Sequence, residues 1–449
     1  MSKERGDVIA HSSADADKAA SRPDWLKERL QWFQDLKFGL ILHWAPYSLW
    51  DCCESWPLVE DDTWARSGPE WAERKDDFKQ FQKDYWNLNQ QFNPIEFDPG
   101  AWADAAKAAG MKYVVFTTKH HDGFCMFDTK TTDYRITHSD SPFHSNERAN
   151  ITRQVFDAFR ERGLAIGCYF SKSDWHCPFY WSPDWPAKNR NCNYDPAQEP
   201  ELWEKFKTFV YTQIEELMSE YGSIDILWLD GGQVRPPKQD IDMDALISMA
   251  RRHQPGLIVV DRASGGPYED VITPEHEIPE LPLGQTWESC NAITSNWKHQ
   301  STNKPKPLAK LIRMLIDTVC CDGNLLLGVG PTPEGTFMDD VLERLSEIGD
   351  WTEVNQEAIY NTRAYPPYRE GNFGYTSDGK FIYAILQAEE SEEEMPPVSL
   401  STSLPAPAGP ISLIGHDQKI DWKHEDGVTT VQVPDQLSDQ LAWTFKIPL

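Results

Sequence analysis

The segment Ile224–Gly232 reads Ile-Asp-Ile-Leu-Trp-Leu-Asp-Gly-Gly, and the rest of the chain is interpreted from it. Five of its first six residues are apolar, which is typical of a strand buried on both faces. The strand stops at Asp230, a carboxylate that is costly to desolvate unless its charge has a use. The two glycines that follow allow a tight turn beside it. We therefore predict that Asp230 is the catalytic centre of an enzyme, whereas Asp225 at the other strand end is a structural or solvated charge.

Helices that end at a glycine, followed by a strand and a polar loop, recur on both sides of this segment. Strands are predicted at 38–43, 113–118, 165–170, 257–260 and 324–329, and helices at 101–109, 152–162, 200–221, 243–253 and 308–321. This alternation is typical of parallel β/α units. No G-x-G-x-x-G follows the first strand, which counts against a dinucleotide-binding sheet.

Polar side chains follow the predicted strands rather than precede them. They are His43, His120, His121, Ser171, Asp230 and Arg262. The active site of a (β/α)8 barrel lies at the C-terminal ends of its strands. The sequence therefore predicts a (β/α)8-like barrel with these residues on its rim.

Three parts of the chain differ in character. Residues 1–22 are predicted to be a disordered tail, 23–355 the catalytic barrel, and 356–449 a small antiparallel β-sandwich with short strands at 381–386, 411–413, 428–433 and 442–447. We expect the sandwich to buttress the barrel rather than to bind sugar.

Composition excludes several classes of partner and location. The net charge of −28 argues against nucleic acid and against an anionic membrane surface. The first twenty residues are polar and no run of eighteen apolar residues occurs, so we expect neither a secretory signal nor a membrane span. The nine cysteines include two adjacent pairs and no C-x-x-C, which favours reduced thiols and a cytoplasmic enzyme. A homo-oligomer is left open.

The candidate site residues point to sugar chemistry. Neighbours on an extended strand face opposite sides, so His120 and His121 are not expected to chelate one metal, and we interpret them as hydrogen-bonding partners of vicinal hydroxyls. Arg262 is predicted to contact a hydroxyl or carboxylate in the pocket. Glu275, Glu277 and Glu288 could each pair with Asp230. A carboxylate pair without metal ligands or a phosphate loop indicates glycoside hydrolysis, with no cofactor.

Five segments resemble motifs of the α-L-fucosidases of glycoside hydrolase family 29. They are Trp32–Trp44, Lys119–Phe124, Gly167–Ser171, Leu227–Gly231 and Asn324–Pro331. The resemblance extends from about residue 32 to about residue 363. It implies a retaining exo-glycosidase that needs no metal and acts on a fucosylated glycan or oligosaccharide, with Asp230 as nucleophile.

The same resemblance assigns the residues around the sugar. It places His43, His120, His121, Trp228 and Arg262 around the fucose, with Tyr169 from the matched Gly167–Ser171 segment. Trp297 resembles the aromatic residue near the sugar methyl. The family's Glu-Trp-Tyr motif is absent from this sequence. Glu54 and Trp56, in Glu54-Ser55-Trp56, are the candidates to replace it, and Glu70-Trp71 is an alternative. Ser295-Asn296-Trp297-Lys298 also departs from the family pattern, and both departures concern the leaving group rather than the chemistry.

The acid/base residue has three candidates, ranked Glu275, Glu288 and Glu277. Glu275 lies in Thr273-Pro274-Glu275, which resembles the acid/base segment of several family members, and a loop over the rim reaches the glycosidic oxygen easily. Burial on a partly apolar loop would raise its pKa. Glu288 is expected at the end of a sixth strand, where it would be a second acid candidate or a substrate contact.

The sequence therefore predicts an exo-acting α-L-fucosidase. Two alternatives remain: an α-glycosidase on a related sugar such as an α-L-galactoside, and a catalytically inactive carbohydrate-binding protein.

Overall fold

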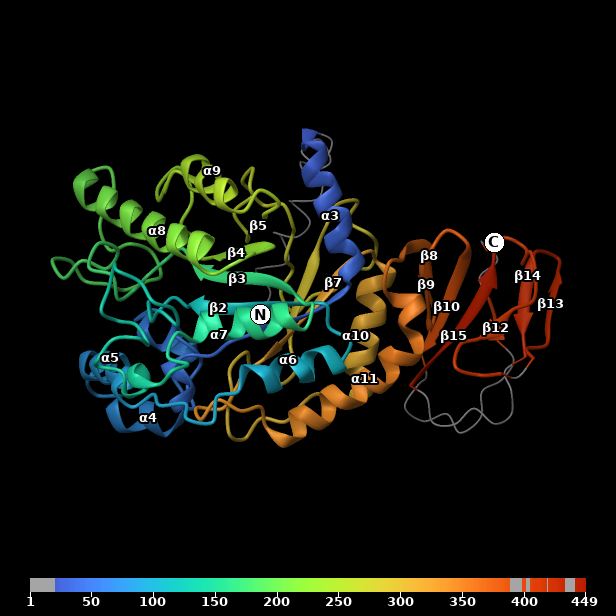
Figure 1. The fold of residues 1–449 in the computed structure, drawn as a ribbon, viewed down its shortest axis with the longest axis horizontal. Coiled ribbons are helices and arrows are strands. Elements are labelled where there is room, and N and C mark those ends of the chain that lie inside the picture. The colour runs from blue at the N-terminus through green and yellow to red at the C-terminus, as the bar shows by residue number, and fades with distance from the viewer. Residues whose placement is uncertain (1–20, 388–397, 401–403, 418, 433–440) are drawn as a thin grey trace.

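Seven parallel strands form one curved sheet in the computed structural model, which describes residues 21–387, 398–400, 404–417, 419–432 and 441–449 (Figure 1). The order across the sheet is β5-β4-β3-β2-β1-β7-β6. The strands are β1 (Phe38–Leu42), β2 (Tyr113–Lys119), β3 (Ala165–Ser171), β4 (Ile226–Asp230), β5 (Ile258–Asp261), β6 (Glu288–Ala292) and β7 (Asn324–Val329). The predicted (β/α)8-like barrel is confirmed. Of the predicted tail, residues 1–20 lie outside the described part of the chain.

An irregular segment, 269–275, occupies the place of the eighth strand between β5 and β6. The Asp270 N–H donates to the Val259 carbonyl oxygen at 3.0 Å on the β5 side. On the β6 side, parallel bridges join Ile272 to Trp287 and Glu275 to Cys290. Because this segment closes the sheet, it carries Glu275 to the same rim as Asp230.

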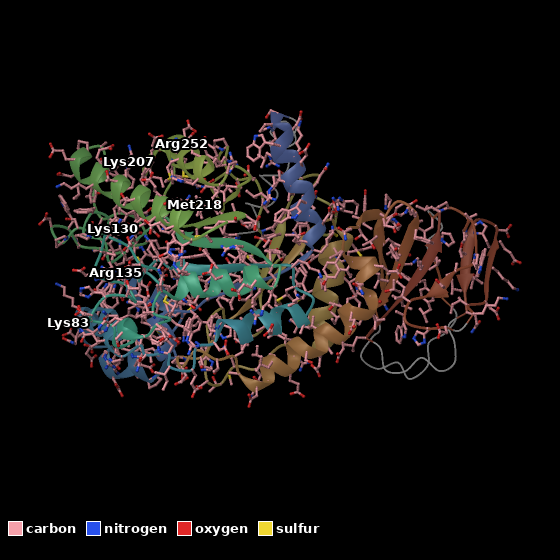
Figure 2. All side chains as sticks on the ribbon, in the orientation of Figure 1. Lys83, Lys130, Arg135, Lys207, Met218 and Arg252 are labelled. Carbon is pink, nitrogen blue, oxygen red and sulfur yellow. The ribbon has the colours of Figure 1, made fainter. Side chains whose placement is uncertain are left out.

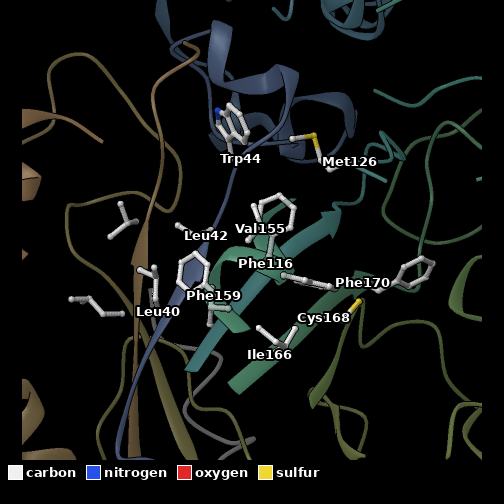
Figure 3. Packing of buried hydrophobic residues seen from close by; sticks show 14 of the residues in the cluster. Leu40, Leu42, Trp44, Phe116, Met126, Val155, Phe159, Ile166, Cys168 and Phe170 are labelled. Carbon is white, nitrogen blue, oxygen red and sulfur yellow. The ribbon is translucent and has the colours of Figure 1, made fainter. Parts of the chain in front are cut away.

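Alternate residues of each strand pack in two different layers. On β1, Leu40 and Leu42 face outward against Val155 and Phe159 of helix α7 (Ile151–Glu161), as Figure 3 shows. Ile41 between them belongs to the cluster inside the barrel. Both faces are buried, which is why the strands read as continuous apolar runs rather than as an alternating pattern.

Helix α3 (Asp24–Leu36) closes the end of the barrel at which the strands begin. Its Leu26, Leu30 and Phe33 belong to the interior cluster. The Phe33 ring contacts the ring of Tyr113, the first residue of β2, at 5.4 Å between centroids. The open end of the barrel is therefore the opposite one, at the C-terminal ends of the strands.

The remaining helices fall into two groups: some cover the outside of the sheet, and others lie within the long loop after β1. The covering helices are α6 (Pro99–Ala108), α7, α8 (Pro200–Glu220), α9 (Met243–His253), α10 (Leu308–Cys320) and α11 (Asp339–Ile359), and the loop holds α4 (Gly68–Arg74), α5 (Phe78–Trp86) and short 3-10 helices. Lys83 of α5 and Lys207 of α8 mark the end of the molecule remote from the C-terminal sheets (Figure 2). Among the described residues, no helix has the length and apolar character needed to cross a membrane.

Two antiparallel sheets form the C-terminal part of the chain. The first has the order β12-β15-β10-β9-β8 and the second β11-β14-β13. Their bounds are β8 (Arg363–Glu370), β9 (Phe373–Ser377), β10 (Phe381–Gln387), β11 (Val398–Ser399), β12 (Ser412–Leu413), β13 (Trp422–Glu425), β14 (Val428–Val431) and β15 (Ala442–Pro448). Val433, predicted as a strand residue, lies outside the described residues.

The larger C-terminal sheet packs against helices α10 and α11. A Cβ on Gly374 of β9 would lie 2.5 Å from the Cys320 sulfur of α10, so the two elements are in close contact. The Thr444 hydroxyl of β15 donates to Asn355 of α11 at 2.7 Å. Helix α11 ends at Ile359, so the predicted boundary at residue 356 falls in its last turn.

Candidate active site

A cavity of about 50 Å³ opens at the C-terminal ends of the strands. It is lined by Ile41, His43, Glu54, Trp56, His120, Tyr169, Trp228, Asp230, Arg262, Glu275, Cys290 and Trp297. The structure thus brings together the predicted site residues except His121, which lies just behind the lining, and the acid candidates Glu288 and Glu277.

Asp230 is held as an anion by groups at or just beyond the C-terminal ends of three strands. Its Oδ2 accepts a hydrogen bond from the Tyr169 hydroxyl at 2.8 Å, and its Oδ1 lies 3.3 Å from Arg262 Nη1. The N–H of Gly231 donates to Oδ1 at 2.7 Å, from a φ of 84° that favours glycine. Burial raises the pKa of this carboxyl, but the Arg262 guanidinium, the Tyr169 hydroxyl and the Gly231 N–H together bring it well below its usual range.

The histidines lie beyond the end of β2, and both rings turn toward the site. Their centroids are 4.4 Å apart, so the prediction that they face opposite sides was wrong: β2 ends at Lys119, and both histidines lie in the loop that follows it. His120 Nδ1 contacts the Ser55 hydroxyl at 2.6 Å. Burial lowers the pKa of His120 well below its ordinary value and that of His121 to about 4, so both rings are neutral near pH 7.

A serine pair selects the tautomer of His121. The Ser171 hydroxyl donates to the Ser173 carbonyl oxygen at 2.6 Å, which leaves it to accept from His121 Nδ1 at 2.6 Å. His121 Nε2 is therefore an acceptor; it lies 3.7 Å from Asp230 Oδ2 and has no hydrogen-bond partner. His43 Nδ1 is likewise buried without one. Orphaned buried groups of this kind fit the hydroxyls of a sugar. The part of the chain that the structure describes contains no cluster of three metal-ligating side chains.

Glu54 and Trp56, rather than Glu70 and Trp71, line the cavity. Glu54 is buried, and its Oε1 accepts from the Lys298 N–H at 3.1 Å while its Oε2 accepts from the Cys53 thiol at 3.0 Å. Burial raises the pKa of Glu54, opposed by Cys53 and Lys298. Trp71 instead packs on Phe81 with 5.2 Å between ring centroids.

The sequence interpretation missed Ile41 and Cys290, which form an apolar part of the lining with Trp297. Both occupy inward positions on their strands. The available signal was the two-residue period of β1, which places Ile41 on the same face as His43. Their apolar side chains are suited to the methyl group of a 6-deoxy sugar.

Glu275 lines the cavity, but its surroundings differ from the prediction. Its carboxylate forms an ion pair with Arg262 and accepts from Trp297 Nε1 at 3.0 Å. Burial raises the pKa of Glu275, yet Arg262 outweighs burial and the pKa lies below the usual value. The expected rise was wrong for the sugar-free protein because a guanidinium that is distant in sequence lies beside the loop.

Glu288 lies beneath the site and not in it. It is the first residue of β6, at the opposite strand end from the rim, whereas we expected it at the last position. Its carboxylate is buried and accepts from the Tyr113 hydroxyl at 2.7 Å and from Trp228 Nε1 at 2.8 Å. Burial raises its pKa to about 7. Glu288 thus positions the Trp228 ring. Glu277 is exposed and is not part of the cavity lining.

The chain is similar in sequence and in fold to several known alpha-L-fucosidases. The alpha-L-fucosidase family model matches residues 8–357. A bovine tissue alpha-L-fucosidase is 27% identical, and the match covers 95% of this chain and 90% of the bovine protein. A human plasma alpha-L-fucosidase is also 27% identical, and the match covers 87% of this chain and 82% of the human protein. Among solved structures, alpha-L-fucosidase isoenzyme 1 of Paenibacillus thiaminolyticus has a TM-score of 0.76 at 28% identity, covering 95% of this chain and 99% of the other. The Thermotoga maritima alpha-fucosidase in complex with fucose has a TM-score of 0.75 at 26% identity over the same shares.

Proposed function

The chain belongs to the alpha-L-fucosidase family, and on that basis we propose that it releases terminal α-L-fucose by double displacement on Asp230 and Glu275. It is an exo-acting α-L-fucosidase, a glycoside hydrolase. In the proposed first step Asp230 attacks the anomeric carbon, the glycosidic bond breaks, and Glu275 protonates the departing oxygen. In the second step Glu275 takes a proton from water, which hydrolyses the glycosyl ester and frees Asp230.

A single guanidinium that contacts both carboxylates carries this proposal. Arg262 lies between Asp230 and Glu275, so the two acids face one another across one side chain. That arrangement favours the narrow separation of retaining enzymes, roughly 5–5.5 Å, over the wider gap that seats a water molecule. When the sugar enters, it separates Arg262 from Glu275. Because the guanidinium no longer stabilises the anion, burial raises the pKa of Glu275, as a general acid requires.

Proton NMR of the sugar first released from an α-L-fucoside tests the mechanism. Two displacements retain the anomeric configuration, so α-L-fucose is expected before mutarotation mixes the anomers. Initial release of the β-anomer would exclude a covalent intermediate on Asp230.

Arg262→Met is expected to move both limbs of the pH profile of kcat/KM to higher pH. Activity requires an ionised Asp230, so it is lost as the pH falls through the pKa of Asp230. It also requires a protonated Glu275, so it is lost as the pH rises through the pKa of Glu275. Arg262 lowers the pKa of both groups, and its removal raises both. The profile is measured on a fucoside with a poor leaving group.

Arg162→Met is the matched control, because that guanidinium pairs with Asp104 on the outside of the barrel. It should leave both limbs in place. An alkaline limb that stays unchanged in Arg262→Met would show that a group other than Glu275 supplies the proton.

We also propose that the enzyme resides in the cytoplasm. All nine cysteines are free thiols in the structure, and seven of them are buried in hydrophobic clusters. Free thiols are typical of a protein in a reducing compartment. Subcellular fractionation of the source cells with an antibody to the protein tests this, and recovery from the culture medium would contradict it.

A further inference from the structure

Trp64 is the most exposed tryptophan among the described residues, with 60% of its surface accessible. It lies in a short 3-10 helix, Thr63–Ala65, in the loop between β1 and β2. Isolated exposed apolar residues are common and need no explanation. Trp64 is not isolated, because it continues the aromatic lining of the active-site cavity.

The continuity runs through Trp56. The Trp64 and Trp56 rings have centroids 6.2 Å apart, inclined at 41°. Trp56 lines the cavity, and its ring lies 4.9 Å from that of His121. An aromatic surface therefore leads from beside the catalytic Asp230 to solvent, and an oligosaccharide whose terminal sugar fills the cavity must leave by such an exit.

The exposed indole is held in a fixed orientation. Trp64 Nε1 donates to Asp62 Oδ1 at 3.2 Å. Asp62 in turn accepts from Arg190 Nε at 2.8 Å and Nη2 at 3.1 Å. The Arg190 guanidinium lies 4.1 Å from the centroid of the Trp56 ring.

A backbone bond ties the two loops together as well. The Asp61 N–H donates to the Lys188 carbonyl oxygen at 2.8 Å, which joins the loop after β1 to the loop after β3. A surface fixed in this way loses little conformational entropy when it binds a ligand. The indole, unlike most exposed side chains, is already in place.

We propose that Trp64, with Asp62 and Arg190, forms a subsite for the pyranose ring to which the fucose is attached. Pyranose rings have apolar faces that stack on an indole and hydroxyl edges that seek hydrogen bonds. Arg190, whose side chain is 43% exposed, has N–H donors beyond the two that Asp62 accepts. The inference rests on the proposed function, since it assigns the leaving-group side of the same site.

Two substrates separate this subsite from the fucose pocket: α-L-fucosyl fluoride, whose leaving group has no ring, and the best substrate from a panel of fucosylated oligosaccharides. Trp64→Ala is expected to lower kcat/KM on the oligosaccharide roughly tenfold, the loss of one stacked ring face. It should leave kcat/KM on the fluoride within about twofold. Trp64→Phe, which keeps a ring, should recover most of the loss.

Trp25→Ala is the matched control. Trp25 is 38% exposed and lies on α3, at the end of the barrel opposite the site, so neither substrate should be affected. Equal losses on both substrates in Trp64→Ala, or no loss on the oligosaccharide, would overturn the subsite. Failure of the unmodified enzyme to hydrolyse the fluoride would instead refute the proposed function.

Discussion

Asp230→Asn is expected to lower kcat on an aryl fucoside by on the order of 10³-fold or more, with the fold retained. The amide cannot form the glycosyl ester, and the loss of a covalent nucleophile raises the barrel enzyme's activation free energy by about 4 kcal/mol or more. The substitution is nearly isosteric, so the Tyr169 and Gly231 hydrogen-bonding groups keep a partner. Steady-state kinetics and circular dichroism measure the two effects separately.

Asp225→Asn is the matched control on the same stretch of chain. Asp225 pairs with Arg29 at 2.9 Å and accepts from the Ile166 N–H at 3.0 Å, at the closed end of the barrel. This variant should lose some thermal stability and keep most of its kcat. Retention of a tenth or more of the activity in Asp230→Asn would place the nucleophile elsewhere.

Glu275→Ala is expected to lose nearly all activity on a fucoside with a poor leaving group, by on the order of 10²–10⁴-fold. On an activated aryl fucoside it should still form the glycosyl-enzyme, because a good leaving group needs no proton. The intermediate then accumulates, since no base activates water. Azide, which needs no base, should restore turnover by displacing Asp230 from the β-linked glycosyl ester with inversion, and give the α-fucosyl azide, detected by mass spectrometry and NMR.

Glu288→Ala should behave in the opposite way. It removes the acceptor of the Tyr113 hydroxyl and of Trp228 Nε1, and each buried donor left unpaired costs about 1–3 kcal/mol. We expect a lower melting temperature and no azide product. Azide rescue in Glu288→Ala, or its absence in Glu275→Ala, would reverse the assignment of the acid.

Much of the barrel was predictable because its signals are local. An apolar run that ends in a polar residue indicates a buried strand, and the same rim collects the ends of all parallel strands. That is why Asp230, His43 and Arg262 could be grouped before the strands were paired. The motif resemblance added Trp297 and favoured Glu275 among the three acid candidates, and both residues line the cavity.

Glu288 shows where local reasoning stops. Whether a residue begins or ends a parallel strand depends on the register with its neighbours, and here Glu288 pairs with Asn324, the first residue of β7. One apolar run is compatible with several registers. The choice between Glu54 and Glu70 also required the path of a long loop after β1, which no periodic pattern describes.

Sequence patterns alone specified the fold class and the family, and they singled out Asp230, the nucleophile that we propose, since each depends on short stretches of sequence. Only the tertiary structure decided the electrostatics and the exit of the site. The low pKa of Glu275 comes from Arg262, thirteen residues away, and the exposed surface from Trp56 to Trp64 is fixed by Arg190, more than one hundred residues away. Charge interactions and stacking act over a few ångströms of space, and the distance between two residues along the chain does not determine their separation in the folded protein.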